Sequence, residues 1–375
     1  MTFKELNISE PVMKALEEKN YVEPTPIQQQ AIPVAILGQD LLGIAQTGTG
    51  KTAAFAIPII EQLMKSGASK SGIRPIRALI LTPTRELAIQ IEESFSDYGK
   101  YTGLRHTVIF GGVSQNPQVK ALKQGVDILI ATPGRLQDLI NQKFIRLNAL
   151  THFVLDEADR MLDMGFIHDI RRILPLLPKK KQTMLFSATM PAEVEKISKS
   201  LLRNPTKVEA APTSSVVDTI EQKLCYVEKP DKINLLIKVL GKQTNKSVLI
   251  FSRTKHGADK IARTLNKNKI KCEAIHGNKS QNARQRALND LKSGAINIIV
   301  ATDIAARGID IQNLGVVINY DLPDVPETYV HRIGRTGRAG NSGLAYTFCS
   351  QEEHSMVKDI QHLTGKKLKT VSLSA

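Results

Sequence analysis

Residues 41–52 read LLGIAQTGTGKT, and this stretch decides the fold that the sequence predicts. Leu41–Ala45 is an apolar run of strand length, and Lys51–Lys65 is predicted to form a helix. The glycine-rich turn between them lets backbone N–H groups converge on one point, at the positive end of the helix dipole. A strand, such a turn and a helix, in that order, are typical of an α/β domain.

Further segments of strand length alternate with stretches long enough for crossover helices. Most are continuous apolar runs, as expected of strands that are buried on both faces of a parallel sheet. In the first half they are Ala78–Thr82, Thr107–Phe110, Asp127–Ala131, Phe153–Leu155 and Thr183–Phe186, and in the second half Val248–Phe251, Lys271–Ile275, Ile296–Ala301, Val316–Tyr320 and Leu344–Phe348. The sequence therefore predicts an α/β fold class with the parallel-sheet pattern present twice.

The join between the halves is predicted at 208–219, a stretch of small residues rich in Pro, Ser and Thr that is typical of a flexible linker. This gives an N-terminal domain 1–207, a linker 208–219 and a C-terminal domain 220–375; a long surface loop inside one domain is the alternative. The segment 127–135 resembles 297–307, which suggests related domains. Gly-Lys-Thr occurs only at 50–52, so we expect one ATP site.

The composition is that of a basic globular protein. The chain has 375 residues, 42% hydrophobic and 23% charged, with a net charge of +15, which favours a polyanion as partner. Up to Ala210 there are 26 Lys and Arg against 21 Asp and Glu, a net of +5, and the remainder has 25 against 15, a net of +10. No secretory signal or membrane span is visible, and three scattered cysteines fit reduced thiols, so we expect a cytoplasmic location and no membrane partner.

Two motifs predict a site for ATP and Mg²⁺. The turn Ala45, Gln46, Thr47, Gly48, Thr49 and Gly50 would hold the phosphates, Lys51 would neutralise them and Thr52 would ligate Mg²⁺. Asp156 and Glu157 follow the strand Phe153–Leu155, where Asp156 would hold Mg²⁺ and Glu157 would orient the attacking water. A glycine-rich turn with a chance lysine and a solvated acidic turn are the alternatives.

Three other segments allow two interpretations each. Arg335 and Arg338 suit the charge of a γ-phosphate in flight, but a solvated basic loop is equally compatible. Gln28 and Tyr21 suit an adenine edge and ring, although Thr25 and the flanking prolines also fit an ordinary helix start. Ser187-Ala188-Thr189 fits a bond to the acidic turn or a helix N-cap.

Hydroxyls, glycines and arginines recur at predicted strand ends, where open parallel sheets bind ligands. Such groups suit phosphate and sugar contacts. The candidates are Pro83, Thr84, Arg85, Gly112, Thr132, Gly134 and Arg135 in the first half, and Gln281, Arg284 and Thr302 in the second. Aromatic residues make up 5% of the chain and Trp is absent, which favours backbone contacts over base stacking.

Taken in order, these motifs resemble the DEAD-box ATP-dependent RNA helicases of superfamily 2, most like the bacterial RhlE-like group. The resemblance covers 3–340 and implies two tandem RecA-like domains joined by a short linker. It implies that Phe3, Tyr21, Thr25 and Gln28 contact adenine, although Asn20-Tyr21 stands where Gly-Phe is common. It also implies a ribose contact at Asp310, arginine fingers at Arg335 and Arg338, and a coupling set of Asp159, Ser187, Thr189 and His331, with the strand-end candidates on the RNA backbone.

The resemblance further implies RNA-stimulated ATP hydrolysis and local separation of short duplexes by a monomer. An ATP-gated RNA clamp or assembly platform that unwinds little is the alternative, and a DNA translocase is a third hypothesis. Ribosome assembly and RNA decay are both compatible settings.

Overall fold

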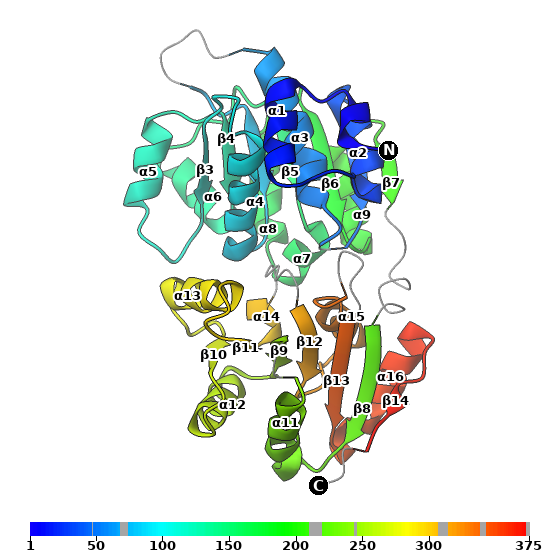
Figure 1. Ribbon diagram of the computed structural model, residues 1–375. Coiled ribbons are helices and arrows are strands. Elements are labelled where there is room, and N and C mark those ends of the chain that lie inside the picture. The colour runs from blue at the N-terminus through cyan, green and yellow to red at the C-terminus, as the bar shows by residue number, and fades with distance from the viewer. Residues whose placement is uncertain are drawn as a thin grey trace. The chain divides into compact units, whose positions relative to one another are not determined.

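A computed structural model describes residues 1–46, 48–67, 74–209, 220–243, 246–306, 314–337 and 343–372. The chain divides into two compact units, Met1–Ala211 and Pro212–Ala375 (Figure 1). None of the helices within these ranges is long and apolar enough to cross a bilayer.

The first unit is built on a seven-stranded sheet in which every pairing is parallel. The strands lie in the order β3-β4-β2-β5-β6-β1-β7. Their bounds are β1 Leu41–Ile44, β2 Ala78–Leu81, β3 His106–Ile109, β4 Ile128–Ala131, β5 His152–Leu155, β6 Gln182–Ser187 and β7 Thr206–Glu209. The helices are η1 Phe3–Leu6, α1 Glu10–Glu18, α2 Pro26–Ile36, α3 Lys51–Lys65, α4 Arg85–Tyr98, α5 Asn116–Lys123, α6 Pro133–Asn141, α7 Ala158–Asp163, α8 Ile167–Ile173, η2 Leu174–Leu176 and α9 Ala192–Leu201.

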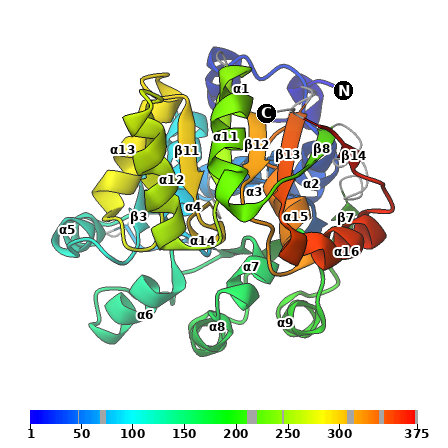
Figure 2. The same cartoon turned by 90° about the horizontal axis from the view of Figure 1, so that it is seen from below.

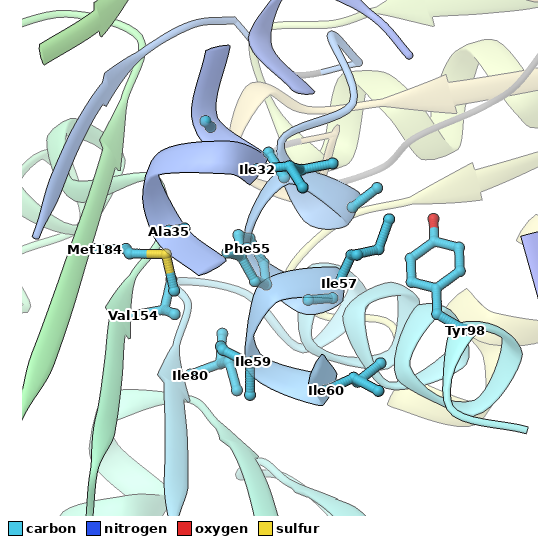
Figure 3. Close-up of a cluster of buried hydrophobic side chains, with 14 of the residues drawn as sticks. Ile32, Ala35, Phe55, Ile57, Ile59, Ile60, Ile80, Tyr98, Val154 and Met184 are labelled. Atoms are coloured by element: carbon cyan, nitrogen blue, oxygen red, sulfur yellow. The ribbon is translucent and has the colours of Figure 1, made fainter. Parts of the chain in front are cut away.

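Two hydrophobic clusters cover the two faces of this sheet. On one face α1, α2, α3 and α4 pack over the strands; Figure 3 shows Phe55 and Ile59 of α3 among Ile80, Val154 and Met184 of β2, β5 and β6. On the other face lie α5 to α9, of which α6, α8 and α9 form a row in Figure 2. Alternate residues of each strand serve the two clusters, which is the period that a sheet buried on both faces requires.

The second unit repeats this architecture. Its strands are β8 Ile220–Tyr226, β9 Ser247–Phe251, β10 Cys272–Ile275, β11 Ile298–Ala301, β12 Leu314–Asn319, β13 Gly343–Cys349 and β14 Lys369–Thr370, in the order β10-β11-β9-β12-β13-β8-β14. Its helices are η3 Lys229–Asp231, α11 Lys232–Gly241, α12 Lys255–Lys267, α13 Gln281–Lys292, α14 Asp303–Ala306, α15 Pro326–Ile333, η4 Gln351–Glu353 and α16 His354–Thr364. The α11 and α12 helices cover one face of this sheet, and α13 to α16 cover the other.

Each strand of the second sheet takes the place of the strand seven numbers before it in the first sheet. The predicted relationship between the halves is therefore visible in the topology, because the similar segments 127–135 and 297–307 contain β4 and β11, which hold equivalent positions. The predicted α/β class with two parallel sheets flanked by helices is confirmed.

Three strands were not predicted, namely β7, β8 and β14. Of these, β7 overlaps the first two residues of the predicted linker. Val208 and Glu209 belong to β7, where Val208 is buried against the first core, so they are not part of a free linker. Residues 210–219 of that predicted linker lie outside the described residues. The other two unpredicted strands, β8 and β14, also lie towards one edge of their sheet.

Candidate nucleotide and RNA sites

The carboxyl ends of the first sheet form one continuous row that carries most of the predicted site residues. Backbone hydrogen bonds join neighbouring ends across the row: Thr132 N donates to Ile109 O, Thr82 N to Ala131 O, Asp156 N to Leu81 O, and Ala45 N to Ser187 O. The strand order thus places the RNA-contact candidates after β3, β4 and β2, and the nucleotide candidates after β5, β6 and β1.

The predicted phosphate loop follows β1 and ends at α3, whose bounds Lys51–Lys65 agree with the sequence-based expectation. Gly48 and Gly50 have φ of +86° and +94°, a conformation that favours glycine. The Lys51 ammonium is buried and donates to Ala45 O at 2.9 Å, so it lies over the loop. Thr47 lies outside the described residues. Thr52 is the second residue of α3, beside the exposed N–H groups of the helix start.

Gln28 connects the start of α2 to this loop. Its amide oxygen accepts from Thr25 N at 2.9 Å, and its amide nitrogen donates to Gly50 O at 3.0 Å. A Cβ placed on Gly50 would lie 2.3 Å from that nitrogen, so only glycine allows this approach. The structure therefore shows the helix start after Thr25 and a contact from Gln28 to the phosphate loop, while the contact of Gln28 with adenine stays a prediction.

Tyr21, the candidate for stacking on adenine, is held on two sides. Its ring centroid lies 6.3 Å from that of Phe3 and 6.0 Å from that of Tyr98, the last residue of α4. Burial, reinforced by the neighbouring Tyr21 phenol, raises the pKa of Tyr98 far above its usual range. Tyr21 is 42% exposed, so part of its ring is accessible. Sequence inspection did not identify Tyr98.

Asp156 and Glu157 are both buried at the end of β5. Glu157 has φ 53°, a left-handed conformation that is rare for a residue other than glycine, and its carboxylate pairs with Arg160. Such backbone strain tends to occur at functional sites. Sequence analysis did not identify Arg160. The signal was present, because Arg160 lies three residues after Glu157 and residues at this spacing can pair on a helix.

The Asp156 carboxylate suits a bound cation. Its Oδ1 is buried and has no hydrogen-bond partner among the described residues, and burial raises the pKa of Asp156 while Lys51 opposes that shift. A divalent cation would satisfy this oxygen and favour the charged form. No group of three acidic, His or Cys side chains suited to a metal occurs in the described ranges, which fits Mg²⁺ held by one carboxylate, a hydroxyl, phosphates and water.

Asp159 connects β5 to the end of β6. Its Oδ2 accepts from Thr189 N at 2.8 Å and from Thr189 Oγ1 at 2.9 Å, while Asp159 N donates to Ser187 Oγ at 3.1 Å. The Ser187 hydroxyl donates in turn to Thr189 O. Of the two interpretations of Ser187-Ala188-Thr189, the structure therefore favours the bond to the acidic turn.

The RNA-contact candidates of the first unit lie together. Arg85 packs against Gly112 so closely that a Cβ there would lie 2.3 Å from its guanidinium, and Arg135 Nη2 donates to Val113 O at 3.0 Å. Thr84 caps α4 by accepting from Leu87 N, which leaves its O–H free to donate elsewhere. Pro83, Thr132 and Gly134 complete this group at the ends of β2 and β4.

The candidates of the second unit occupy equivalent strand ends. Gln281 and Arg284 lie in the first turn of α13, and Arg284 Nη2 donates to Ala305 O at 3.4 Å; Thr302 follows β11. The α15 helix contains His331 but ends at Ile333, so the buried Arg335 lies in the turn after it. Arg338 and Asp310 lie outside the described residues.

Arg332, which the sequence did not single out, fixes this turn. It is fully buried and makes two bonds to Asp303, at 2.6 and 2.7 Å, and one to Asp321 O. Its guanidinium also stacks over the Phe251 ring. Breaking such a buried pair costs about 3–5 kcal/mol, so the interaction anchors α15 to the sheet.

The second unit has a counterpart of Lys51 that is neutralised within the fold. Lys232 begins α11 after β8, as Lys51 begins α3 after β1. Its buried ammonium lies 2.7 Å from Glu353 Oε2, 2.9 Å from Tyr320 O and 3.8 Å from Asp321 Oδ1. A lysine whose charge is balanced by carboxylates does not attract phosphate, which agrees with the expectation of one ATP site.

Comparisons with known proteins agree with this arrangement. Residues 25–197 match the DEAD/DEAH box helicase family, and residues 231–340 match the helicase conserved C-terminal domain. The DEAD-box ATP-dependent RNA helicase CshA of Bacillus subtilis is 43% identical over 368 residues, which is 98% of this chain and 73% of that protein. The chain belongs to the DEAD-box ATP-dependent RNA helicases. CshA of Streptococcus pneumoniae is 42% identical, over 98% of this chain and 69% of that protein.

Solved structures of DEAD-box proteins share the fold. S. cerevisiae Dbp5 bound to RNA and ADP BeF3 matches with a TM-score of 0.87 and 32% identity, over 99% of this chain and 95% of that one. A DEAD box protein from the hyperthermophile Methanococcus jannaschii matches with a TM-score of 0.58 and 38% identity, over 99% of both chains. The protein is thus an ATP-dependent RNA helicase with two tandem RecA-like domains, as the sequence predicted.

Proposed function

We propose that this helicase hydrolyses Mg-ATP at the ends of β1, β5 and β6, and grips the RNA backbone at the ends of β2, β3 and β4 and at their equivalents in the second unit. The observation that supports the proposal best is the continuous row of strand ends, joined by backbone hydrogen bonds. The RNA complex of Dbp5, with a bound phosphate analogue, supports the use of both ligands.

In this proposal each part of the row has one task. The phosphate loop binds the triphosphate through its N–H groups and Lys51. Gln28 links the start of α2 to this loop through its hydrogen bond to Gly50 O. Asp156 and Thr52 would hold Mg²⁺, which would supply positive charge to neutralise the phosphates. Glu157 orients the attacking water. The Phe3–Tyr21 pair contacts adenine, and Asp310 contacts the ribose.

The coupling set and the arginines complete the proposed cycle. Asp159, Ser187 and Thr189 transmit the state of the nucleotide, with His331 as a partner from the second unit. Arg335 and Arg338 stabilise the charge that develops on the γ-phosphate. RNA held through its backbone at Thr84, Arg85, Gly112, Thr132, Gly134, Arg135, Gln281, Arg284 and Thr302, together with Pro83, is bent or displaced locally, so that short duplexes separate.

The wider setting is also a proposal. A monomer in the cytoplasm, acting in ribosome assembly or RNA decay, is compatible with a basic chain whose cysteines are buried and unpaired within the described ranges. The relatives reported above are named CshA, at 43% identity for that of Bacillus subtilis, so they support a CshA-type bacterial helicase and not specifically the RhlE-like group that the sequence predicted.

The variant Glu157→Gln tests the hydrolysis site. The amide keeps the side-chain shape but removes the base, so we expect RNA-stimulated turnover to fall about a hundredfold or more, while ATP and RNA still bind. Turnover and binding are measured on the same RNA, with Glu193→Gln, a partly exposed position on α9, as control. Unchanged turnover would remove Glu157 from the mechanism, and strong turnover without RNA would contradict the RNA-stimulated cycle.

A further inference from the structure

The exposed side of α12 carries an uninterrupted line of basic residues. His256, Lys260, Arg263 and Lys267 are all exposed and are spaced by four, three and four residues, so they lie on one side of the helix. The opposite side packs on the sheet through Ala258, Ile261, Ala262 and Leu265. We call the four basic residues His256, Lys260, Arg263 and Lys267 the α12 stripe. It spans about 16 Å, at 1.5 Å per residue.

Positive charge is concentrated in this region, and carboxylates outside it balance only some of its basic residues, among them Lys232 and Arg253. Residues 229–271 contain twelve Lys and Arg against two Asp and Glu, a net of +10. Within the part of the chain that the structure describes, Lys260, Arg263 and Lys267 form no ion pair, whereas Lys196 and Lys199 on α9 pair with Glu193 and Glu195. Like charges at helical spacing repel each other, so the stripe carries a small cost that a bound polyanion would remove.

The only acidic residue of α12 is already engaged. Asp259 contacts His276 Nε2 at 3.0 Å and Lys279 Nζ at 2.9 Å, both at the end of β10. The Asp259 carboxylate therefore pairs with residues that follow β10 and forms no ion pair with the α12 stripe among the described residues. Lys269 and Lys271, both exposed, continue the basic surface beyond the helix.

The stripe begins at the edge of the second sheet where the RNA-contact candidates of that unit lie, and it leads away from this edge. A crossover helix starts at the carboxyl end of one strand and returns to the amino end of the next. Accordingly, α12 starts just after β9, where Lys255 Nζ lies 3.2 Å from Asn278 Oδ1 in the loop before α13. The stripe contains no Phe, Tyr or Trp, and three of its four side chains are long cations, so it suits phosphate contacts better than base stacking.

We propose that the α12 stripe is a second, sequence-independent RNA surface, which binds the phosphodiester backbone of RNA that extends beyond the segment held at the strand ends. RNA is favoured over an acidic protein because the enzyme already holds RNA, and the stripe continues from the side of the sheet where the contact candidates lie. The proposal deepens the proposed RNA-binding function and depends on it only for the position of the first contact.

The test compares two RNAs on the full chain. One is a single strand of about ten nucleotides, and the other carries the same strand with a duplex extension of about twenty base pairs. The triple variant Lys260→Gln, Arg263→Gln, Lys267→Gln removes three positive charges from an exposed surface. The double variant Lys196→Gln, Lys199→Gln on α9 is the matched control, since those charges are already paired.

We expect the triple variant to bind the extended RNA about tenfold more weakly. The salt slope, which is the slope of log affinity against log salt concentration, should become shallower by about two to three, because each lost phosphate contact lowers this slope by about one. Affinity for the short strand and ATPase activity at saturating short RNA should stay unchanged, as should both measurements in the control. The single variant Lys267→Gln, farthest from β9, should show a smaller loss on extended RNA only.

Three results would overturn the proposal. The first is an unchanged salt slope on the extended RNA, and the second is an equal loss of affinity for both RNAs. The third is a variant that keeps its RNA affinity but loses binding to polyglutamate, which would identify the stripe as a surface for acidic protein. Failure of the wild type to bind the short strand would instead contradict the proposed strand-end contacts.

Discussion

Glu157 shows how much of the site depends on single side chains in unusual conformations. Its backbone is left-handed, and its carboxylate pairs with Arg160 one turn further along α7. The direction of the carboxylate is therefore fixed by the backbone and by an ion pair, so it does not depend on a free rotamer. Preorganisation of this kind contributes to catalysis because the group does not have to reorient in the transition state.

Tyr98→Phe tests how the adenine candidate Tyr21 is positioned. The substitution removes only the hydroxyl of Tyr98, which interacts with the Tyr21 phenol, so we expect the KM for ATP to rise a few fold while kcat changes little. Stability should fall by about 1 kcal/mol, the usual contribution of one hydrogen bond.

Tyr101→Phe is the control for this prediction, since it removes a hydroxyl bonded to the exposed Glu18. A kcat that falls while KM stays constant would contradict a positioning role for Tyr98. So would an identical effect of both variants on the KM for ATP.

At this scale the sequence predicted the charged residues well and their supports poorly. Lys51, Asp156 and Glu157 lie beside a glycine turn or a strand end, so their chemistry is visible in short motifs. Tyr98 and Arg332 act through contacts with residues distant in sequence, and no short pattern reveals such contacts. Thr47, Asp310 and Arg338 lie outside the described residues, and the roles of all the site residues stay predictions.

The elements of the fold were predictable wherever a strand is buried on both faces. The strands β2 and β4 are buried along their length, as is β9 apart from Ser247, and their apolar runs gave their bounds to within a residue or two. By contrast, β7 has one buried residue in four and β14 has none, so neither differs from a loop in its pattern. The polar residues of β8 concealed it in the same way.

The start of β5 supplies a prediction about acid stability. His152 is buried, its Nε2 lies 2.7 Å from Gln62 Oε1, and burial, with the nearby Arg77, lowers the pKa of His152 to about 4. The unfolded chain therefore takes up this proton first as the pH falls. Stability should decrease between about pH 6.5 and 4, by about 3 kcal/mol at most.

His152→Gln should reduce the loss of unfolding free energy over this pH range. Chemical unfolding at a series of pH values would measure this loss. The same change at the exposed His168 serves as control and should leave the slope as it is. A slope for His152→Gln identical to that of the wild type would show that another group causes the acid dependence.

For the whole molecule, the two sheets share one strand order but differ in the charge at equivalent helix starts. Lys51 lies over a phosphate loop, and Lys232 is neutralised by Glu353. Sequence similarity between the halves predicted their relationship, and the single Gly-Lys-Thr predicted one ATP site. The neutralising contact was not predictable, because Glu353 is 121 residues away from Lys232.

Arg335→Ala tests whether the second unit completes hydrolysis on the first. If Arg335 acts only on the transition state, RNA-stimulated turnover should fall about a hundredfold, whereas ATP affinity without RNA should stay within a factor of two. Turnover and nucleotide affinity are measured on the intact chain.

Arg203→Ala, at an exposed position in the first unit, is the matched control. Equal losses of turnover and affinity would argue for a role in ground-state binding. A melting temperature well below that of the wild type would instead attribute the loss to the fold around Arg332.

The hydrogen bond from Asp156 N to Leu81 O has a consequence for how the enzyme senses its substrate. It joins the last residue of β2, just before Pro83 and Thr84, to the first residue after β5. Neighbouring strands are about 4.8 Å apart, so the proposed RNA contacts at Pro83 and Thr84 and the proposed metal ligand Asp156 are adjacent. Information about bound RNA then needs no long allosteric route within this unit, because a small displacement of one loop changes the position of the reacting groups directly.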